Sequence, residues 1–530
     1  MERLSTFCLL TMCFLLWMVS SVQGQTLFDQ GVREFGQENY EEALPFLLEA
    51  RSADKGSARI AYYIGLTYKV MEKYKEAIPY FKDAATLTPR VDEGVVELVD
   101  VLYHTNDIVE AEKWIAFAEK EGINTARLYF LSGMVLSKRG KFDEAILAFE
   151  SAKKLDPRVT QQAELQIAGI YTQQGKYKDA QARLRTTITL DPASDLALYA
   201  RDYEKIVADK AERERPWRFS LGMGYKYDTN VVTKGDGPMV ESISGQEDSA
   251  INFGARIGYT APFSFRTPFS LSAYYSIYSD RYLGKTYTRS DGTEGNLTEY
   301  NNMTNTVSVV PGYAFGRFGV SLPLTYSYVS LQGVKGNSFF NELNWWNQTR
   351  YQETKAVTPT LRFLTTASSF GEIFFSYMRK KYFDTELHPE VPQEEERSGE
   401  RMTGGLGWTY TFKENKAFFT LRYSYAQDNA IGRNWVNTEN RFGADLLYPI
   451  VGTLRGQVSA EANFVKYTYE NTYFEQNRRD DIYNVSVALL YGIIKNTDIV
   501  LQYNYYRNQS NIALYDCTRD VYGLGVEYRF

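Results

Sequence analysis

The sequence has few of the residues on which enzyme chemistry usually depends. Its 530 residues include three cysteines and two histidines, His104 and His388, and nothing in the sequence sets His388 beside a nucleophile. The sequence contains no Cys/His cluster with metal-ligand spacing and no Gly-rich phosphate loop that opens a helix. It therefore predicts a protein that is not an enzyme and uses neither a cofactor nor a metal.

Long apolar runs are lacking everywhere except at the N-terminus. After Met1-Glu2-Arg3, an apolar run extends around Cys8 to Val19, and small residues in Ser20 to Gly24 suit cleavage before Gln25. This pattern predicts a signal peptide over residues 1–24. Lipidation at Cys13 is the alternative, but this cysteine lies inside the apolar run rather than after it. Removal of the leader leaves Cys517 as the only thiol, so no intrachain disulfide is possible.

Strong charge is also missing. The net charge of −6 is too mild to indicate a nucleic-acid partner. Aromatic residues, by contrast, make up 15% of the chain, with 42 tyrosines. Tyrosine is enriched where a protein crosses the membrane–water interface, because its ring can lie among lipid while its hydroxyl stays hydrated. The mean hydropathy of −0.39 does not exclude a membrane barrel, because only alternate strand residues face lipid.

A 34-residue period is present in the first 215 residues. Ala43, Ala77, Ala111 and Ala145 are spaced by 34, and Ala180 follows after 35. Gly, Tyr, Phe and Pro recur around these alanines at matching offsets, and the pattern resembles the tetratricopeptide repeat. The units are placed near 24–57, 58–91, 92–125, 126–159 and 160–194, with a capping helix over 195–214.

The resemblance implies a partner-binding concave face built from the first helix of each pair. By the family's register, this face includes Phe28, Tyr62, Val96 and Phe130, again at intervals of 34. Four cations flank them: Arg59, Lys69, Arg127 and Lys138. One interpretation is a groove for an extended peptide or another periplasmic protein. The alternative is that the aromatic residues only pack between helices.

Helical periodicity stops at Pro216, and residues of alternating polarity follow to the end of the chain. Trp217, Phe219 and Leu221 alternate with Arg218, Ser220 and Gly222, which is the period-2 pattern of a strand with lipid on one side and water on the other. Short and long connections alternate, with Tyr469 to Arg479 among the long ones, and counting strands between them gives 14. We predict an antiparallel transmembrane barrel over 216–530 rather than a soluble β-sandwich, with short turns in the periplasm and the repeat domain, 25–215, on that side.

The last strand carries a second resemblance. Tyr522, Leu524, Val526, Tyr528 and Phe530 share one face, and the chain ends on an aromatic residue. This arrangement resembles the C-terminal sorting signal of bacterial outer-membrane barrels, with Gly525, Tyr528 and Phe530 at matching positions and Gly523 as a departure at the polar first position. The resemblance implies recognition by the barrel-assembly machinery and insertion into the outer-membrane lipid bilayer.

Assigning the polar face of each strand inward gives a predicted lumen lining. One interpretation is a pore that favours anions or anionic polymers, because a ring of guanidinium groups focuses a positive potential. The alternative is a hydrated lumen in which ion pairs cancel the charge. A slip of one residue would invert the lining for that strand. The predicted lining residues are Arg218, Arg256, Arg362, Arg422, Arg441, Arg455, Glu461, Glu527 and Arg529.

The whole architecture resembles the surface lipoprotein assembly modifiers of Gram-negative bacteria, as does the segment from Tyr225 to Val231 at the first strand. This implies an outer-membrane protein that captures a periplasmic protein or lipoprotein cargo with its repeats and passes it to or across the membrane through the barrel. The main alternative is an exopolysaccharide export pore for an anionic polysaccharide. A third is a periplasmic scaffold that the barrel only anchors.

Overall fold

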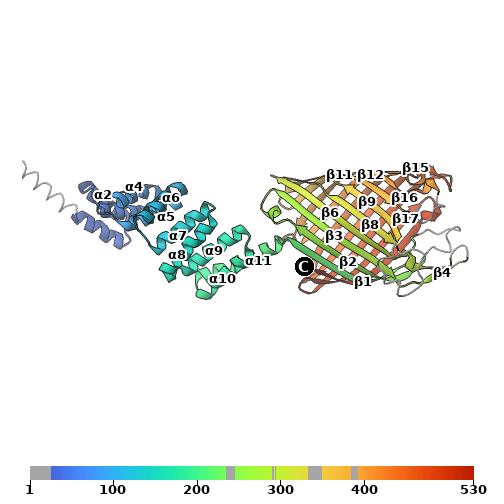
Figure 1. Ribbon diagram of the computed structural model, residues 1–530, viewed down its shortest axis with the longest axis horizontal. Coiled ribbons are helices and arrows are strands. Elements are labelled where there is room, and N and C mark those ends of the chain that lie inside the picture. The colour runs from blue at the N-terminus through green and yellow to red at the C-terminus, as the bar shows by residue number, and fades with distance from the viewer. Residues whose placement is uncertain (1–24, 234–244, 289–291, 293, 332–348, 384–391) are drawn as a thin grey trace, which may run out of the picture. The chain divides into compact units, whose positions relative to one another are not determined.

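The computed structural model describes residues 25–233, 245–288, 292, 294–331, 349–383 and 392–530. The predicted signal peptide, 1–24, and His388 lie outside the described residues. The chain divides into two compact units, Met1–Arg213 and Glu214–Phe530. The first is helical and the second is a β-barrel (Figure 1).

The helical unit is a stack of antiparallel helix pairs with one helix left over at its end (Figure 1). Residues 25–36 form the first helix. The remaining helices are α2 (Tyr40–Ala53), α3 (Ala58–Val70), α4 (Tyr74–Thr86), α5 (Asp92–His104), α6 (Ile108–Lys120), α7 (Ala126–Lys138), α8 (Phe142–Leu155), α9 (Thr160–Gln174), α10 (Tyr177–Leu190) and α11 (Asp195–Arg213). The tetratricopeptide part of the predicted fold class is confirmed.

Close helix crossings explain the residue types of the repeat. A Cβ atom added to Gly65 on α3 would lie 2.7 Å from the Phe81 ring on α4, and one added to Gly133 on α7 would lie 2.8 Å from the Phe149 ring on α8. Both phenylalanines are fully buried, as are the five alanines that define the period. A larger side chain at either glycine would therefore separate the two helices of its pair.

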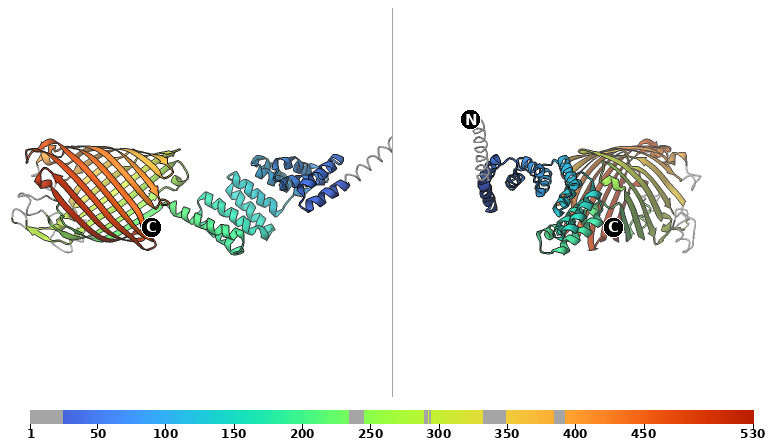
Figure 2. Two further views of the ribbon diagram at one scale, coloured as in Figure 1. Left: turned by 180° about the vertical axis from the view of Figure 1, so that it is seen from behind. Right: turned by 60° about the vertical axis from the view of Figure 1, so that its left-hand side comes forward.

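The second unit is an antiparallel sheet that closes on itself. Figure 2 shows its strands running obliquely around the barrel. The strands are β1 (Trp217–Asp228), β2 (Asp248–Thr260), β3 (Phe269–Tyr282), β6 (Asn302–Phe315), β7 (Phe318–Ser321), β8 (Leu324–Leu331), β9 (Thr349–Val357), β10 (Thr360–Thr366), β11 (Ser369–Tyr382), β12 (Gly399–Phe412), β13 (Ala417–Ala430), β14 (Asn437–Val451), β15 (Leu454–Asn471), β16 (Gln476–Ile494), β17 (Thr497–Ser510) and β18 (Cys517–Arg529). A small hairpin of β4 (Thr286–Thr288) and β5 (Glu294–Asn296) stands apart from this sheet.

Two of the wall strands are each interrupted once. Strand β7 continues into β8 past Pro323, and β9 continues into β10 past Pro359. Proline has no backbone N–H to donate to a neighbouring strand, which accounts for both breaks. Counting each interrupted strand once gives the 14-stranded closed barrel that the sequence predicted. β1 pairs with β18, so both ends of the barrel segment lie at the same rim.

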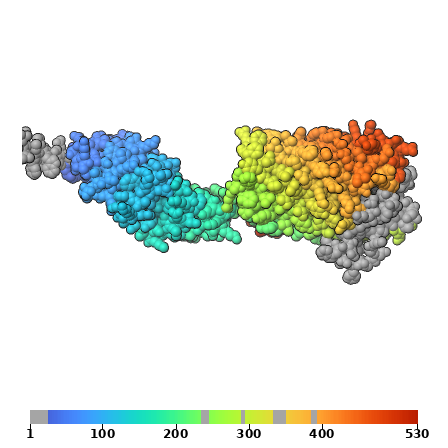
Figure 3. Space-filling view, turned by 45° about the horizontal axis from the view of Figure 1, so that its top comes forward, coloured from blue at the N-terminus to red at the C-terminus, as the bar shows by residue number. Residues whose placement is uncertain are grey.

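The connections at one rim are short turns and those at the other are mostly longer. One predicted long connection is different: β15 extends to Asn471 and β16 begins at Gln476, so most of Tyr469 to Arg479 is strand. Apart from Tyr469, the strand residues there are polar on both faces, and alternation therefore gave no sign that the two strands continue so far. The space-filling view shows an unbroken outer wall over the yellow and orange strands (Figure 3).

Candidate functional site

The predicted aromatic residues of the repeat groove pack against other rings. Phe28 is buried and makes an edge contact with Tyr63, with 5.5 Å between ring centroids. Tyr62 lies 6.2 Å from Phe81, and Phe130 lies 5.2 Å from Phe149. Val96 is buried as well. These four side chains therefore contribute to packing between helices, which is the alternative that the sequence left open.

Two of the predicted groove cations converge on a pair of acids that sequence reasoning missed. Lys69 on α3 and Arg127 on α7 both bind Glu97 and Asp100 on α5, with Lys69 Nζ 2.5 Å from Glu97 Oε2 and Arg127 Nη2 3.1 Å from Asp100 Oδ2. His104 Nε2 lies 3.4 Å from Asp100 Oδ1. The available signal was the spacing of Glu97, Asp100 and His104, which places them on one face of a helix.

The other two predicted cations lie over aromatic rings. Arg59 is 5.4 Å from the Phe28 ring centroid, and Lys138 Nζ is 4.1 Å from that of Tyr103. Lys138 also donates to Asn106 Oδ1 at 3.3 Å. All four predicted cations thus have intramolecular partners, and carboxylates balance the charges of two of them, Lys69 and Arg127.

Tyr62 borders this charged cluster. Burial, together with the carboxylates of Glu97 and Glu93, raises the pKa of Tyr62 to about 12, although Arg127 acts in the opposite direction. The Tyr62 hydroxyl therefore stays protonated at neutral pH and remains available as a hydrogen-bond donor to a ligand.

The barrel has an apolar and a polar face. Directly opposite residues on neighbouring strands share a face, so the pairing register traces rows around the wall. Exposed apolar side chains occupy the outward rows, for example Leu421, Leu501 and Leu524. One inward row crosses seven consecutive strands, from β12 to β18, through Gly407, Arg422, Gly443, Glu461, Asn484, Tyr506 and Arg519.

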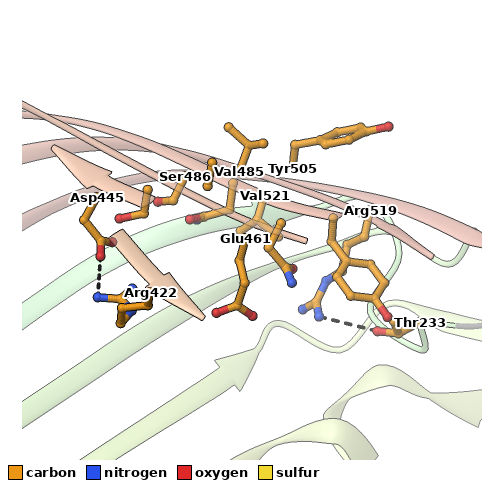
Figure 4. Close-up of a pocket in the computed structure, with 14 residues that line it drawn as sticks. Thr233, Arg422, Asp445, Glu461, Val485, Ser486, Tyr505, Arg519 and Val521 are labelled. Atoms are coloured by element: carbon orange, nitrogen blue, oxygen red, sulfur yellow. Dashed lines mark hydrogen bonds and ion pairs between the residues drawn. The ribbon is translucent and has the colours of Figure 1, made fainter. Parts of the chain in front are cut away.

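All nine predicted lining residues lie on the polar face of their strands, and five of the seven arginines form ion pairs there. Figure 4 shows Arg422, Glu461 and Arg519 on one side of the strands and Tyr505 on the other. The pairs are Arg362–Glu372 at 3.2 Å, Arg422–Asp445 at 2.5 Å, Arg441–Glu439 at 2.9 Å, Arg455–Asp498 at 2.5 Å and Arg529–Glu527 at 2.6 Å. Arg441 also lies 3.8 Å from Glu461.

Arg256 differs from these five arginines. Arg256 packs over the Tyr274 ring at 4.6 Å and forms no ion pair with any residue that the structure describes. Arg218 lies opposite Gly258, close to Arg256 in the register, near the rim that carries the short turns. The lumen is therefore largely charge-paired, with the guanidinium of Arg256 as an exception near that rim.

Several ion pairs were missed because their partners come together only in the register. Asp228 at the end of β1 is fully buried and accepts from Arg519 of β18 and, at 2.8 Å, from the Tyr282 hydroxyl. Lys380 lies 2.6 Å from Asp428, and Arg401 lies 2.5 Å from Glu439. Each of these side chains lies on the polar face of its strand, but the alternation does not show which residues are neighbours.

The residues that resemble a sorting signal help to close the seam between β1 and β18. Phe530 and Phe219 exchange two backbone hydrogen bonds of 2.8 Å. A Cβ atom at Gly525 would lie 2.9 Å from the Met223 carbonyl oxygen, so the strands approach closely at this glycine. Tyr528 and Phe530 are exposed on the outward face. Their recognition by the assembly machinery stays a prediction.

Neither a metal site nor a spanning helix is found in the described parts of the chain. No group of three or more His, Cys, Asp or Glu side chains among these residues is arranged to hold a metal ion. None of the helices described here combines the length and the apolarity needed to cross a membrane.

Comparison with known families supports both halves of this architecture. A family described as "Putative beta-barrel porin 2" matches residues 314–530, and the tetratricopeptide repeat family matches residues 58–90 and 126–159. No curated protein matches the chain.

Solved structures resemble the helical unit. YrrB, described as "a TPR protein with an unusual peptide-binding site", is 26% identical, with a TM-score of 0.30, and the match covers 33% of this chain and 90% of that one. MamA from Desulfovibrio magneticus RS-1 is 19% identical, with a TM-score of 0.31 and coverage of 33% and 97%. TTC0263 from Thermus thermophilus is 20% identical, with a TM-score of 0.28 and coverage of 35% and 98%. By the two family matches, the chain combines tetratricopeptide repeats with a C-terminal porin-like β-barrel, a class of outer-membrane protein.

Proposed function

We propose that this protein is a translocation component of the outer membrane. Its repeat domain binds a periplasmic protein or lipoprotein cargo, and its barrel provides the path to or across the membrane. The observation that carries this proposal is the joining, in one chain, of an interaction array and a closed barrel with a polar lumen. Short turns and both ends of the barrel segment lie at one rim, which supports a periplasmic location of the repeats.

The charged cluster on α3, α5 and α7 is the proposed cargo contact. Lys69, Arg127, Glu97 and Asp100 offer donors and acceptors side by side, and the side chain of Arg127 is 52% exposed. Such a surface suits an extended peptide backbone, which itself carries both donors and acceptors. A strongly anionic ligand would have to displace Glu97 and Asp100 from their cations first.

Export of an anionic polysaccharide is a second candidate, and one observation favours it. Arg256 has no carboxylate partner in the described lumen, and it lies against a tyrosine ring. An unpaired guanidinium beside an aromatic face suits a negatively charged sugar polymer. The five ion-paired arginines weaken this candidate, because each acid cancels the attraction that its arginine would exert.

Conductance of the full chain in planar bilayers tests the path. We expect steady channels with weak ion selectivity, because most lumen charges are paired. Absence of conductance would contradict an open path, and strong anion selectivity would favour polymer export.

Photo-crosslinking in intact cells tests the capture step. A photoreactive residue at Lys138, in the groove, is expected to give an adduct with a discrete periplasmic protein. The same residue at Leu147, which is 68% exposed on α8, serves as the matched control and is expected to give none. Equal adducts from both positions would show that the groove has no selective role.

A further inference from the structure

Two pairs of cations face each other directly across neighbouring strands of the barrel. Lys466 on β15 is paired with Arg479 on β16, and Lys355 on β9 is paired with Arg379 on β11. Like charges directly opposite each other in a sheet repel and destabilise the pairing. Such a pair calls for an anion, either from the protein itself or from outside the wall.

All four side chains lie on the outward face of the barrel. Lys466 shares its face with the exposed Val458, and Arg479 shares its face with the exposed Val487. Lys355 is opposite Tyr326, and Arg379 is four residues beyond Phe375, which are 40% and 49% exposed. These cations are therefore on the lipid side of the wall, not in the lumen.

Both pairs are near the rim that carries the longer connections. Lys466 is two residues beyond Phe464 toward the β15–β16 turn, and Arg379 is two residues beyond Tyr377 toward the end of β11. Aromatic side chains on the lipid face mark the membrane interface. The cations thus stand at the height at which lipid headgroups meet the protein.

Counter-ions within the protein differ between the two pairs. Glu400 on β12 lies directly opposite Arg379, on the same outward face. Lys466, Arg479 and Arg379 are exposed and form no ion pair with any part of the chain that the structure describes. Asp481, the outward carboxylate nearest to Arg479 along β16, does not pair with it either. Lys355 is the exception, with its Nζ 2.7 Å from Glu353 Oε1. The pair formed by Lys466 and Arg479 is thus the better anion site of the two.

We propose that the pair Lys466 and Arg479, with Lys355 and Arg379 as a second site, binds the phosphate groups of the glycolipid in the outer leaflet. Lysine and arginine bind phosphate through charge-assisted hydrogen bonds, and a phosphate between two cations relieves their repulsion. The acyl chains of the same lipid would cover the apolar wall below. This inference rests on the proposed orientation, with the longer connections outside the cell.

Native mass spectrometry of the full chain with lipid A tests the site. Bisphosphorylated lipid A is expected to bind about tenfold more tightly than its dephosphorylated form, since each cation near an anionic lipid surface contributes modestly. The double variant Lys466→Gln/Arg479→Gln is expected to lose about that factor, and Lys355→Gln/Arg379→Gln is expected to lose less. Equal binding of the two lipids, or an unchanged first variant, would overturn the proposal.

Three controls distinguish loss of the proposed lipid site from a general effect of charge, from binding of free anions and from misfolding. The variant Lys413→Gln/Lys416→Gln removes the same charge from a turn at the other rim and is expected to leave binding unchanged. Inorganic phosphate at millimolar concentration is expected not to compete; displacement of lipid A would show a site for free anions and overturn the lipid assignment. Because all three variants alter exposed side chains, heat-dependent gel mobility of the folded barrel should match that of the original protein.

Orientation is measured independently of binding. A cysteine at Thr472, in the β15–β16 turn, is expected to react with a membrane-impermeant maleimide on whole cells. Failure of this labelling would contradict the proposed orientation, and with it the outer-leaflet ligand. Loss of conductance with intact lipid A binding would contradict only the transport function.

Discussion

The two units of this chain distribute the same residue types in opposite ways. In the repeat domain, Phe81 and Phe149 are fully buried between helices. In the barrel, Leu501 and Leu524 are 55% and 56% exposed on the outer face, while Arg422 and Asp445 pair inside. Folding in water gathers apolar side chains in a core, whereas a barrel in a membrane presents them to lipid and keeps most of its charges in the lumen or near the rims. The solvent on each side, rather than composition, decides which face a residue occupies.

The largest effect is expected from emptying the core of a repeat. Phe149→Ala removes a fully buried ring that packs against Gly133, and it should cost the repeat domain roughly 3–5 kcal/mol of unfolding free energy. Urea unfolding followed by helical circular dichroism measures this loss. The matched control, Leu147→Ala at a 68% exposed position, should change stability by less than about 0.5 kcal/mol. Similar losses for the two variants would contradict the assignment of the core.

A charge on the lipid face should have the next largest effect. Leu501→Arg is expected to destabilise the barrel by roughly 2–4 kcal/mol, because the guanidinium must leave water for hydrocarbon. Urea-dependent refolding of the full chain into lipid vesicles measures this cost. Gln457→Arg, on the inward face of β15, is the control and should fold normally. If the two variants behaved alike, the lipid and water faces would have been assigned wrongly.

The positions that were predictable from sequence are those set by local periodicity. The 34-residue spacing of the alanines identified the helix pairs, and alternation from Trp217 onward identified the barrel, because both patterns arise from neighbours along the chain. Ion-pair partners were not predictable. Glu97 reaches Lys69 across 28 positions, and Arg519 reaches Asp228 across 291. Such pairs depend on helix stacking and strand register, which a single sequence does not reveal.

Unpairing one lumen carboxylate should produce a smaller, electrical effect. Arg422→Ser leaves Asp445 without its partner and should shift ion selectivity toward cations, by a factor of roughly two in permeability ratio. The reversal potential of the full chain in a salt gradient measures the shift. Arg422→Lys keeps the positive charge and should resemble the original protein. No shift with serine would place Asp445 away from the ion path.

The smallest effect is expected from pH in the repeat domain. Burial alone would raise the pKa of Glu150, but hydrogen bonds and charge from Lys153 and Arg183 lower it below its usual value. A lowered pKa in the folded state adds stability above the unfolded pKa, about 4.3, and that stability is lost as pH falls through the folded value.

The stabilisation from Glu150 should be less than about 1 kcal/mol, because the carboxylate is partly exposed. Glu150→Gln should therefore unfold at lower urea than the original protein at pH 7, and the difference should narrow at acidic pH. The exposed control Glu144→Gln should show no such convergence. A difference that widened on acidification would reverse the sign assigned here.

The central claim is that the barrel presents apolar side chains to lipid on its outside and polar side chains to water in its lumen. Thiol accessibility along one strand tests this claim most directly. In a Cys517→Ser background, single cysteines are placed at positions 501 to 506 of β17, and the full chain is reconstituted into bilayers. A water-soluble maleimide should label positions 502, 504 and 506, whose side chains face the lumen, and should spare 501, 503 and 505. Uniform labelling, or labelling of the opposite set, would contradict a closed barrel with lipid outside and water within.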